Sequence, residues 1–187
     1  METDKRREQF IMAALQLFSE KGITKTSIGD ISTSVGVARS LFYHYFPNKT
    51  AIINAVVENR VDDFVNQFVQ WNKAYKLRST RQSLGDIVTL LRNYLTDPKS
   101  ICNIVAHEDS RELWQKFSVQ SANKLSQRYA ERRSRGPMVA NQSVVRHPKE
   151  SFYMLTIGVI STLLRFPEIP DETIVEVIAD LMHIPLE

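Results

Sequence analysis

Hydrophobic and polar positions follow the three- and four-residue spacing of helices along most of the chain. In the first segment this spacing forms one apolar stripe, made of Phe10, Ile11, Ala14, Leu15, Leu17 and Phe18. Gly22 follows the stripe, and a glycine that takes positive φ often ends a helix. Thr26 and Ser27 are N-cap residue types, and Asp30 lies three residues after Ser27, as in a capping box. A helix ending near Gly22 and a second helix after Ser27 are therefore predicted.

The second predicted helix is short and ends at Gly36. Its inward residues are Ile28, Ile31 and Val35. A third helix is expected from about residue 37 to residue 46, where Pro47 disfavours further helix. Two short helices joined by a glycine-containing turn form a helix-turn-helix arrangement, here at residues 27–46. The spacing alone fits DNA binding and also an αα-hairpin with no nucleic-acid role.

Helical spacing continues to the end of the chain, with breaks where polar or helix-breaking residues cluster. A long helix begins at residues 48–50, and a polar, basic stretch at 76–82 ends it. Later helices are expected at 84–95, 112–133, 151–166 and 171 to about 183, with a short apolar turn or helix at 101–105 and a loop at 135–148. No run of residues has the period-2 pattern of a strand. The chain is predicted to be all-α, with about nine helices.

Composition narrows the class of protein without selecting a function. The chain has 187 residues, a net charge of +3, 43% hydrophobic residues and 24% charged residues, as expected of a folded soluble protein. One cysteine, Cys102, excludes an internal disulfide framework and a multi-cysteine zinc module. The apolar stretch 152–166 is shorter than the ~20 residues of a membrane helix, and the N-terminus lacks a signal-peptide pattern. We expect a cytoplasmic protein with no membrane partner.

Catalytic and metal-binding patterns are missing from the sequence. The four histidines fall in separate elements, and there is no H-E-x-x-H, no G-x-S-x-G and no phosphate-cradling glycine loop. His107, Glu108 and Asp109 are adjacent, so on a helix they point in different directions. The sequence therefore predicts no enzyme activity, no cofactor and no metal site.

The stretch from Thr26 to Lys49, TSIGDISTSVGVARSLFYHYFPNK, resembles the DNA-binding head of TetR-family transcriptional regulators. The shared pattern is two Thr or Ser residues, an Ile, a Gly-Val turn, Tyr-x-x-Phe and a Lys three residues later. The resemblance covers about residues 5 to 60 by motif, and the rest of the chain matches only in length and helical layout.

Four positions depart from the family's usual pattern. Ser32 and Val35 stand where small alanines are expected, and both remain compatible with tight helix packing. Ala38 stands where a serine often opens the recognition helix, so that cap is lost. Ser40 replaces a frequent glycine and adds a side chain that can touch DNA. The DNA sequence that is recognised is expected to differ from family norms.

The resemblance implies a three-helix DNA-binding head at residues 4–64 and a helical effector-binding and dimerisation body at 65–187. It implies a sequence-specific transcriptional regulator, a ligand-released repressor acting as a homodimer on a palindromic operator. The sequence does not separate repressor from activator. The competing interpretation is a helical protein-interaction module that does not bind DNA.

The expected DNA contacts lie in and around the two short helices. They are Thr26, Ser27, Arg39, Ser40, Tyr43, His44 and Lys49. Arg39 and Ser40 open the recognition helix, where Arg39 suits a bidentate contact to guanine. Thr26 and Ser27 suit a phosphate at a helix N-terminus or serve only as caps. For Tyr43 and His44 the resemblance implies phosphate contacts, and Lys49 resembles a phosphate-gripping lysine. Each charged residue alone is more often a solvated surface charge, and it is their clustering on one short head that favours DNA contact.

Two further sets of residues are expected in the body. The dimer surface is predicted to use the last two helices as half of a four-helix bundle, through Phe152, Leu155, Val159, Leu163, Ile174, Ile178 and Leu181. The alternative is that these helices form a monomeric core. An unknown small, largely apolar effector is expected among Trp71, Tyr75, Tyr94, His107, Trp114, Phe117 and Tyr129. Each of these seven also fits an ordinary core or surface position.

Overall fold

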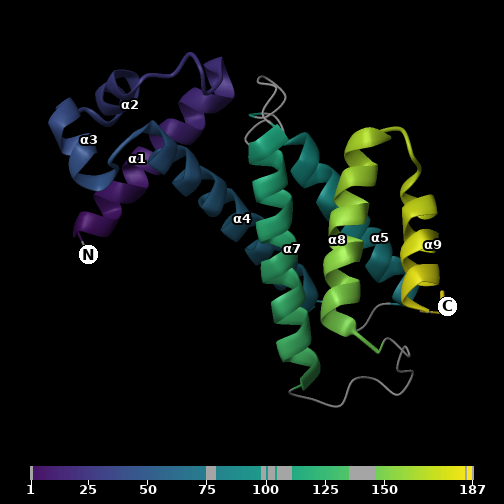
Figure 1. The fold of residues 1–187 in the computed structure, drawn as a ribbon. Helices are drawn as coiled ribbons and strands as arrows, with labels where there is room; N and C mark the ends of the chain where they lie inside the picture. The colour runs from purple at the N-terminus through teal and green to yellow at the C-terminus, as the bar shows by residue number, and fades with distance from the viewer. Residues whose placement is uncertain are drawn as a thin grey trace. The chain divides into compact units, whose positions relative to one another are not determined.

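The structure is a computed structural model that describes residues 2–74, 79–97, 100, 104, 111–134, 146–183 and 185–186. Within these residues the fold consists of eight helices and no strands, which confirms the predicted all-α class (Figure 1). The helices are α1 (Glu2–Lys21), α2 (Ile28–Val35), α3 (Arg39–Tyr45), α4 (Lys49–Ala74), α5 (Thr80–Thr96), α7 (Arg111–Ser134), α8 (Pro148–Arg165) and α9 (Asp171–Met182). About nine helices were predicted, and most of the short segment 101–105 lies outside the described residues.

The chain packs as two compact units. One contains Met1–Asp62 together with Thr96–Phe117, and the other contains Asp63–Leu95 together with Ser118–Glu187. Below, residues 2–62 are called the head and the second unit is called the body. The domains 4–64 and 65–187 stay a prediction; in this division the first boundary falls after Asp62, and Thr96–Phe117 groups with the first unit.

The head is shaped by the turn signals seen in the sequence. Gly22 and Gly36 both have positive φ, 83° and 74°, and end α1 and α2 as predicted. Phe10 of α1 is fully buried and meets the ring of Phe42 edge-on, with ring centroids 5.5 Å apart. Phe46 closes the same cluster, with its centroid 5.6 Å from that of Phe42. These aromatic contacts fix α3 against α1.

Local caps set where α4 and α5 begin. The Asn48 side chain accepts from the Ala51 backbone N–H at 2.9 Å, which starts α4 close to the predicted position. Ser79 and Gln82 form a reciprocal pair, in which each backbone N–H donates to the other side chain at 3.3 Å. This capping box starts α5 at Thr80, so residues 80–82 are helical and not part of a break as the polar stretch 76–82 suggested.

The core of the body is formed by α5, α7, α8 and α9. In Figure 1, α8 lies between α7 and α9. The buried apolar residues here include Val88, Leu91, Leu125, Val159, Ile160, Leu163, Ile174, Val175 and Ile178. Arg92 of α5 ties the α8–α9 connection down, because its guanidinium donates to the Pro167 and Ile169 carbonyls, each at 2.6 Å, and to Asp171 Oδ1 at 2.7 Å.

The described residues lack two kinds of feature. None of their helices is both long and apolar enough to cross a membrane. No group of three or more His, Cys, Asp and Glu side chains among them is arranged to hold a metal ion.

Candidate nucleic-acid interface and body cavity

Four predicted DNA-contacting side chains share the outer face of α3. Arg39, Ser40, Tyr43 and His44 are all exposed, and their spacing of one, three and four residues places them on one side of the helix. Phe42, on the opposite side, is completely buried. The N-cap residue Ala38 makes no side-chain cap hydrogen bond, as the sequence predicted. α3 is therefore a short helix held by its apolar side, with polar side chains facing outward.

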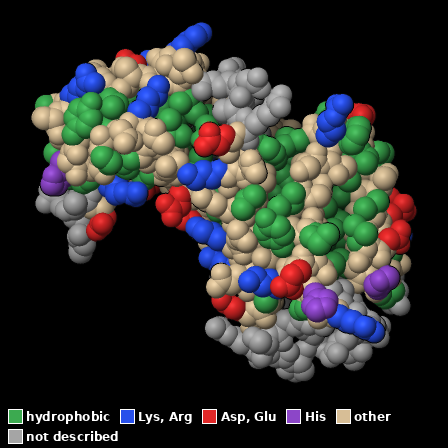
Figure 2. All heavy atoms as spheres, viewed as in Figure 1, with side chains coloured by type: hydrophobic (Ala, Val, Ile, Leu, Met, Phe, Trp, Pro, Cys, Tyr) green, Lys and Arg blue, Asp and Glu red, His purple; other side chains and the backbone are tan. Residues whose placement is uncertain are grey.

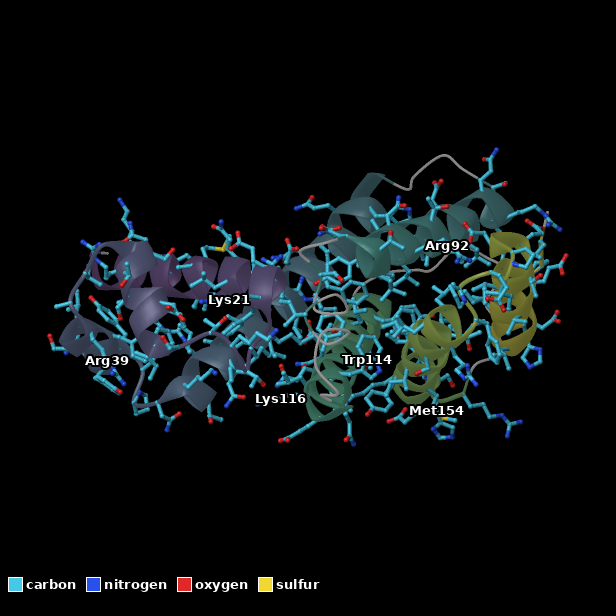
Figure 3. The ribbon with its side chains drawn as sticks, turned by 90° about the horizontal axis from the view of Figure 1, so that it is seen from above. Lys21, Arg39, Arg92, Trp114, Lys116 and Met154 are labelled. Atoms are coloured by element: carbon cyan, nitrogen blue, oxygen red, sulfur yellow. The ribbon has the colours of Figure 1, made fainter. Side chains whose placement is uncertain are left out.

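Arg39 is held against Tyr43 by two interactions. The Arg39 Nη2 donates to the Tyr43 hydroxyl at 3.1 Å, and the guanidinium carbon lies 5.7 Å from the ring centroid. Figure 3 shows Arg39 at the edge of the head. Because the Tyr43 oxygen accepts from Arg39, its own O–H remains able to donate elsewhere. The pair presents a guanidinium and a phenolic O–H side by side.

Thr26 and Ser27 have different roles, and the structure corrects the expectation for Thr26. The Thr26 side chain is 1% exposed and donates from Oγ1 to the Gly22 carbonyl at 2.7 Å. A hydroxyl buried in this way holds the α1–α2 turn and cannot reach a phosphate. Ser27 is exposed and forms the predicted capping box: its Oγ accepts from the Asp30 N–H, and the Asp30 carboxylate accepts from the Ser27 N–H.

Asp30 also pairs with Lys21 at the end of α1, a contact that sequence reasoning missed. Lys21 Nζ lies 2.8 Å from Asp30 Oδ2. The hydrogen bond from Lys21, with those from the Ser27 backbone and side chain, lowers the pKa of Asp30 from 3.8 to about 2. The carboxylate is therefore charged at neutral pH and joins the C-terminus of α1 to the N-terminus of α2. The sequence does contain a signal for the Lys21–Asp30 contact. It is an acid three residues after the cap, together with a lysine directly before Gly22.

Lys49 begins α4 and points back toward the segment before α2. Its Nζ donates to the Thr24 carbonyl at 3.4 Å. Lys25, next to Thr24, is exposed. This places the ammonium of Lys49 beside the segment that precedes α2.

A cavity of about 210 Å³ lies in the body. Its walls come from α4, α5, α7, α8 and α9, through Phe68, Trp71, Leu84, Ile87, Leu91, Leu125, Tyr129, Phe152, Leu155, Thr156, Val159, Ile178 and Met182. No charged side chain belongs to this described lining. The Thr156 hydroxyl is already used, because it donates to the Phe152 carbonyl at 2.8 Å. The cavity suits an apolar occupant.

Two of the seven residues expected at an effector site, Trp71 and Tyr129, line this cavity. Tyr129 stacks on Phe152, with ring centroids 4.6 Å apart. Tyr94, Trp114 and Phe117 do not line it: Tyr94 packs on Phe64, and Trp114 packs on Phe117 within the other unit. The predictions for Tyr75 and His107 lie outside the described residues.

Comparison with known proteins supports the resemblance in the head. The family model for bacterial regulatory proteins of the tetR family matches residues 10–56. Residues 10–56 therefore match the DNA-binding head of the TetR family. A transcriptional regulator of Bacillus subtilis, YvdT, is 39% identical over 66 residues, which are 35% of this chain and 34% of that protein. The biofilm operon negative regulator IcaR of Staphylococcus epidermidis is 37% identical over 60 residues, 32% of each chain. The chain thus covers about a third of the length of these curated relatives.

Solved structures extend the likeness of fold beyond the TetR-family head. A tetR-family regulator from Streptomyces coelicolor superposes with a TM-score of 0.67 at 19% identity, over 95% of this chain and 83% of that one. The regulator FadR of Bacillus subtilis, solved with stearoyl-CoA, gives a TM-score of 0.53 at 18% identity, over 94% and 96% of the two chains. At these identities the likeness shows the fold alone.

The structure corrects most of the dimer surface expected from the TetR resemblance. Val159, Leu163, Ile174 and Ile178 are buried inside the body of a single chain. Phe152 and Leu155 are half-buried and line the cavity. Residues of α5, α7, α8 and α9 of the same chain line one cavity, which includes Val159 and Ile178. Of the predicted set, Leu181 alone is exposed, at 64%.

The outer sides of α8 and α9 carry a different apolar set. The exposed large apolar residues are Met154 and Leu164 of α8, Phe166 directly after α8, and Val177 and Leu181 of α9. Gly158 and Ser161 are exposed on the same side of α8 as Met154. Figure 2 shows hydrophobic side chains over α7, α8 and α9, and Figure 3 shows Met154 on the side of α8 away from α5.

Proposed function

We propose that this TetR-family protein is a transcriptional repressor that binds a palindromic DNA operator as a homodimer and is released by a small, largely apolar effector. The observation that carries the proposal is the exposed row Arg39, Ser40, Tyr43 and His44 on α3 of a TetR-family head. Repression is chosen over activation because IcaR, the Staphylococcus epidermidis relative, is named a negative regulator.

Base recognition is assigned to the first turn of α3. Arg39 makes a bidentate contact to guanine in the major groove, and Ser40 contacts a neighbouring base edge. Stacking on Tyr43 supports this role, because it limits the conformations that the Arg39 side chain must give up on binding. The Tyr43 O–H donates to a phosphate while its oxygen accepts from Arg39, so one phosphate contact also orients the base-reading residue.

Phosphate contacts are assigned to the groups around that turn. His44 lies one turn along α3 from Ser40, and Lys49 brings its ammonium to the segment before α2. Ser27 contributes through its hydroxyl only, because its backbone N–H already donates to Asp30. These contacts set affinity and its salt dependence, and they carry no base specificity.

Dimerisation is assigned to the outer sides of α8 and α9. One head reads only a few base pairs, so a palindrome requires two heads related by symmetry. Val177 and Leu181 of α9 and Leu164 of α8 are apolar and exposed in the single chain, while Gly158 and Ser161 permit close approach of a partner helix. A four-helix bundle of α8 and α9 from two chains covers these side chains.

Effector release is assigned to the body cavity and α4. α4 is one helix that begins at Lys49, a proposed phosphate contact, and carries Phe68 and Trp71 in the cavity wall. A ligand that shifts these two aromatic residues acts on the helix that holds Lys49. Because the two binding equilibria are linked, the ligand lowers DNA affinity by a certain factor, and DNA lowers ligand affinity by the same factor.

Selection of duplexes from a random DNA pool by the purified protein tests the proposal. The expected product is a palindromic consensus with a guanine in each half-site, bound by two chains. Enrichment of no consensus, with the protein folded and dimeric, contradicts the proposal and favours a helical protein-interaction module.

A further inference from the structure

Two serine hydroxyls on α7 are buried with no hydrogen-bond partner in the described part of the chain. Ser118 is 5% exposed and Ser121 is 0% exposed, and neither Oγ has a partner there. Buried serines elsewhere behave differently: Ser32, Ser83 and Ser126 each donate to a backbone carbonyl three or four residues earlier. Among the described residues, the unpartnered state is therefore particular to this place on α7.

Burying a hydroxyl without a partner is unfavourable. The desolvation costs about 1–3 kcal/mol for each group, which is a large fraction of the stability of an ordinary domain. Native proteins keep such groups where a function uses them or where a bound molecule supplies the missing hydrogen bond. Ser118 and Ser121 lie one turn apart on α7, so one polar group placed between them serves both.

Both serines lie on the face of α7 that carries two cavity-lining residues, although neither serine is itself part of the lining. Leu125 and Tyr129 line the body cavity. Ser121 precedes them by four and eight residues, and Ser118 precedes them by seven and eleven. Each of these offsets returns to about the same side of a helix. With a rise of 1.5 Å per residue, Ser121 lies about 6 Å and Ser118 about 10 Å along the axis from Leu125. Ala122 stands between them, is fully buried and carries only a methyl group. On this face of α7 only a methyl group therefore separates the two hydroxyls from the lining residue Leu125.

We propose that the effector is an uncharged amphiphile whose apolar part fills the body cavity and whose hydroxyl or carbonyl oxygen hydrogen-bonds to Ser118 and Ser121. This rests on the proposed effector function and adds the chemical class of the ligand. A serine hydroxyl both donates and accepts, so the pair fits an alcohol or a carbonyl equally well. A charged head group is disfavoured, because neither the two buried serines nor the described cavity lining supplies a counter-charge, and an unpaired buried charge is costly.

The cavity also sets the size of the probe. An apolar cavity of about 150 Å³ holds one benzene molecule. In proportion, a cavity of about 210 Å³ holds roughly eight non-hydrogen atoms. 1-Heptanol and 1-chloroheptane both have eight non-hydrogen atoms and the same chain, and only the alcohol forms strong hydrogen bonds. Comparing the two isolates the polar contact from burial of the chain.

Trp71 reports binding directly, because it lines the cavity. The protein contains two tryptophans, and replacing the other one, Trp114→Phe, leaves Trp71 as the source of the emission. In this background, titration with each probe is followed by Trp71 fluorescence in three forms of the protein: parent, Ser118→Ala/Ser121→Ala, and Ser126→Ala. The Ser126→Ala variant is the matched control, because the Ser126 hydroxyl is buried on the same helix but donates to the Asn123 carbonyl.

The expected result is that Ser118→Ala/Ser121→Ala weakens binding of 1-heptanol about tenfold and leaves 1-chloroheptane unchanged, while Ser126→Ala changes neither relative to the parent. The double variant should melt at the same temperature as the parent or higher, because it removes two unpartnered hydroxyls and alanine favours helix.

Three results overturn the inference. The first is equal binding of 1-heptanol to the parent and the double variant, and the second is no binding of either probe to the parent. The third is a lower melting temperature of the double variant, which would show that the hydroxyls already have partners. DNA binding is measured separately on the same proteins. A parent that binds its selected duplex but neither probe retains the proposed DNA-binding function while the proposed ligand class fails.

Discussion

Arg39 and Lys49 represent the two kinds of contact that the head is proposed to make. Arg39 stands on the outer face of α3 and is oriented by the Tyr43 ring and hydroxyl. Lys49 stands at the first residue of α4, with its ammonium near the Thr24 carbonyl. A base contact and a phosphate contact respond differently to base changes and to salt, so the two roles are separable by experiment.

Arg39→Ala is expected to lower discrimination at one base position of the selected duplex by about 1–3 kcal/mol. Lys49→Ala is expected to weaken all duplexes alike and to reduce the slope of log affinity against log salt by about 1. Anisotropy titrations against the selected duplex and its single-base variants measure both effects. A uniform loss in Arg39→Ala, with discrimination kept at every position, would remove Arg39 from base recognition.

Asp30 gives the head a defined response to acid. Its pKa in the folded chain is about 2, below the ordinary 3.8, because Lys21 and Ser27 hydrogen-bond the charged form. A lowered pKa stabilises the fold above about pH 4, and this contribution is lost as the pH falls toward 2. Asp30→Asn should therefore melt below the wild type at pH 7, with a difference that shrinks between pH 4 and pH 2. Thermal melts across this range check the prediction, and a difference independent of pH contradicts it.

Some residue roles could be predicted from sequence because they depend on local geometry. Gly22, Gly36 and the Ser27–Asp30 capping box act within a few residues, and all are as expected. Thr26 shows the limit. Its residue type fits both a cap and a phosphate contact, and only the fold shows that its hydroxyl is buried against the Gly22 carbonyl.

At the scale of elements, Arg92 connects α5 to the segment between α8 and α9. Its guanidinium donates to two carbonyls and to Asp171, and it is largely shielded from solvent. Arg81 of α5 also pairs with α9, through Glu172, but both of those side chains are exposed. The two arginines therefore provide a matched pair on one helix.

Arg92→Ala is expected to lower the free energy of unfolding by about 2 kcal/mol, because hydrogen bonds to a charged group are lost and their acceptors are left with poorer partners. Arg81→Ala is expected to cost less than about 1 kcal/mol, as exposed ion pairs do. Urea unfolding at fixed protein concentration compares the variants. Equal effects would show that Arg92 is no more than another surface ion pair.

Helix positions were predictable because apolar periodicity, caps and breakers are local. The start of α5 was placed too late because the Ser79–Gln82 capping box lies within a stretch that is polar overall.

The residues facing each helix's neighbours were less predictable. Val159 and Ile178 lie on apolar stripes, and a stripe does not show whether its partner belongs to the same chain or to another. The cavity-lining residues Leu84, Ile87 and Leu91 had no predicted role beyond the helix 84–95, since a cavity depends on where packed helices fail to meet.

At the scale of the whole molecule, the proposed homodimer depends on the outer sides of α8 and α9. Leu181→Arg places a charge on a side chain that is exposed in the single chain, so the fold of the monomer should be kept while the dimer is lost. Affinity for the palindrome should fall to that for a single half-site. Light scattering after gel filtration measures the mass, and Met12→Arg, at an exposed apolar position of α1, is the control. A Leu181→Arg protein that stays dimeric would exclude this face.

Sequence-specific DNA binding is the central claim, and an equilibrium titration tests it most directly. A labelled duplex carrying the selected palindrome is compared with a scrambled duplex of the same composition, at several salt concentrations. We predict at least a roughly 10³-fold preference for the palindrome, with log affinity falling linearly as log salt rises. Equal affinity for the two duplexes at every salt concentration, or no binding to either by the folded dimer, would contradict the account.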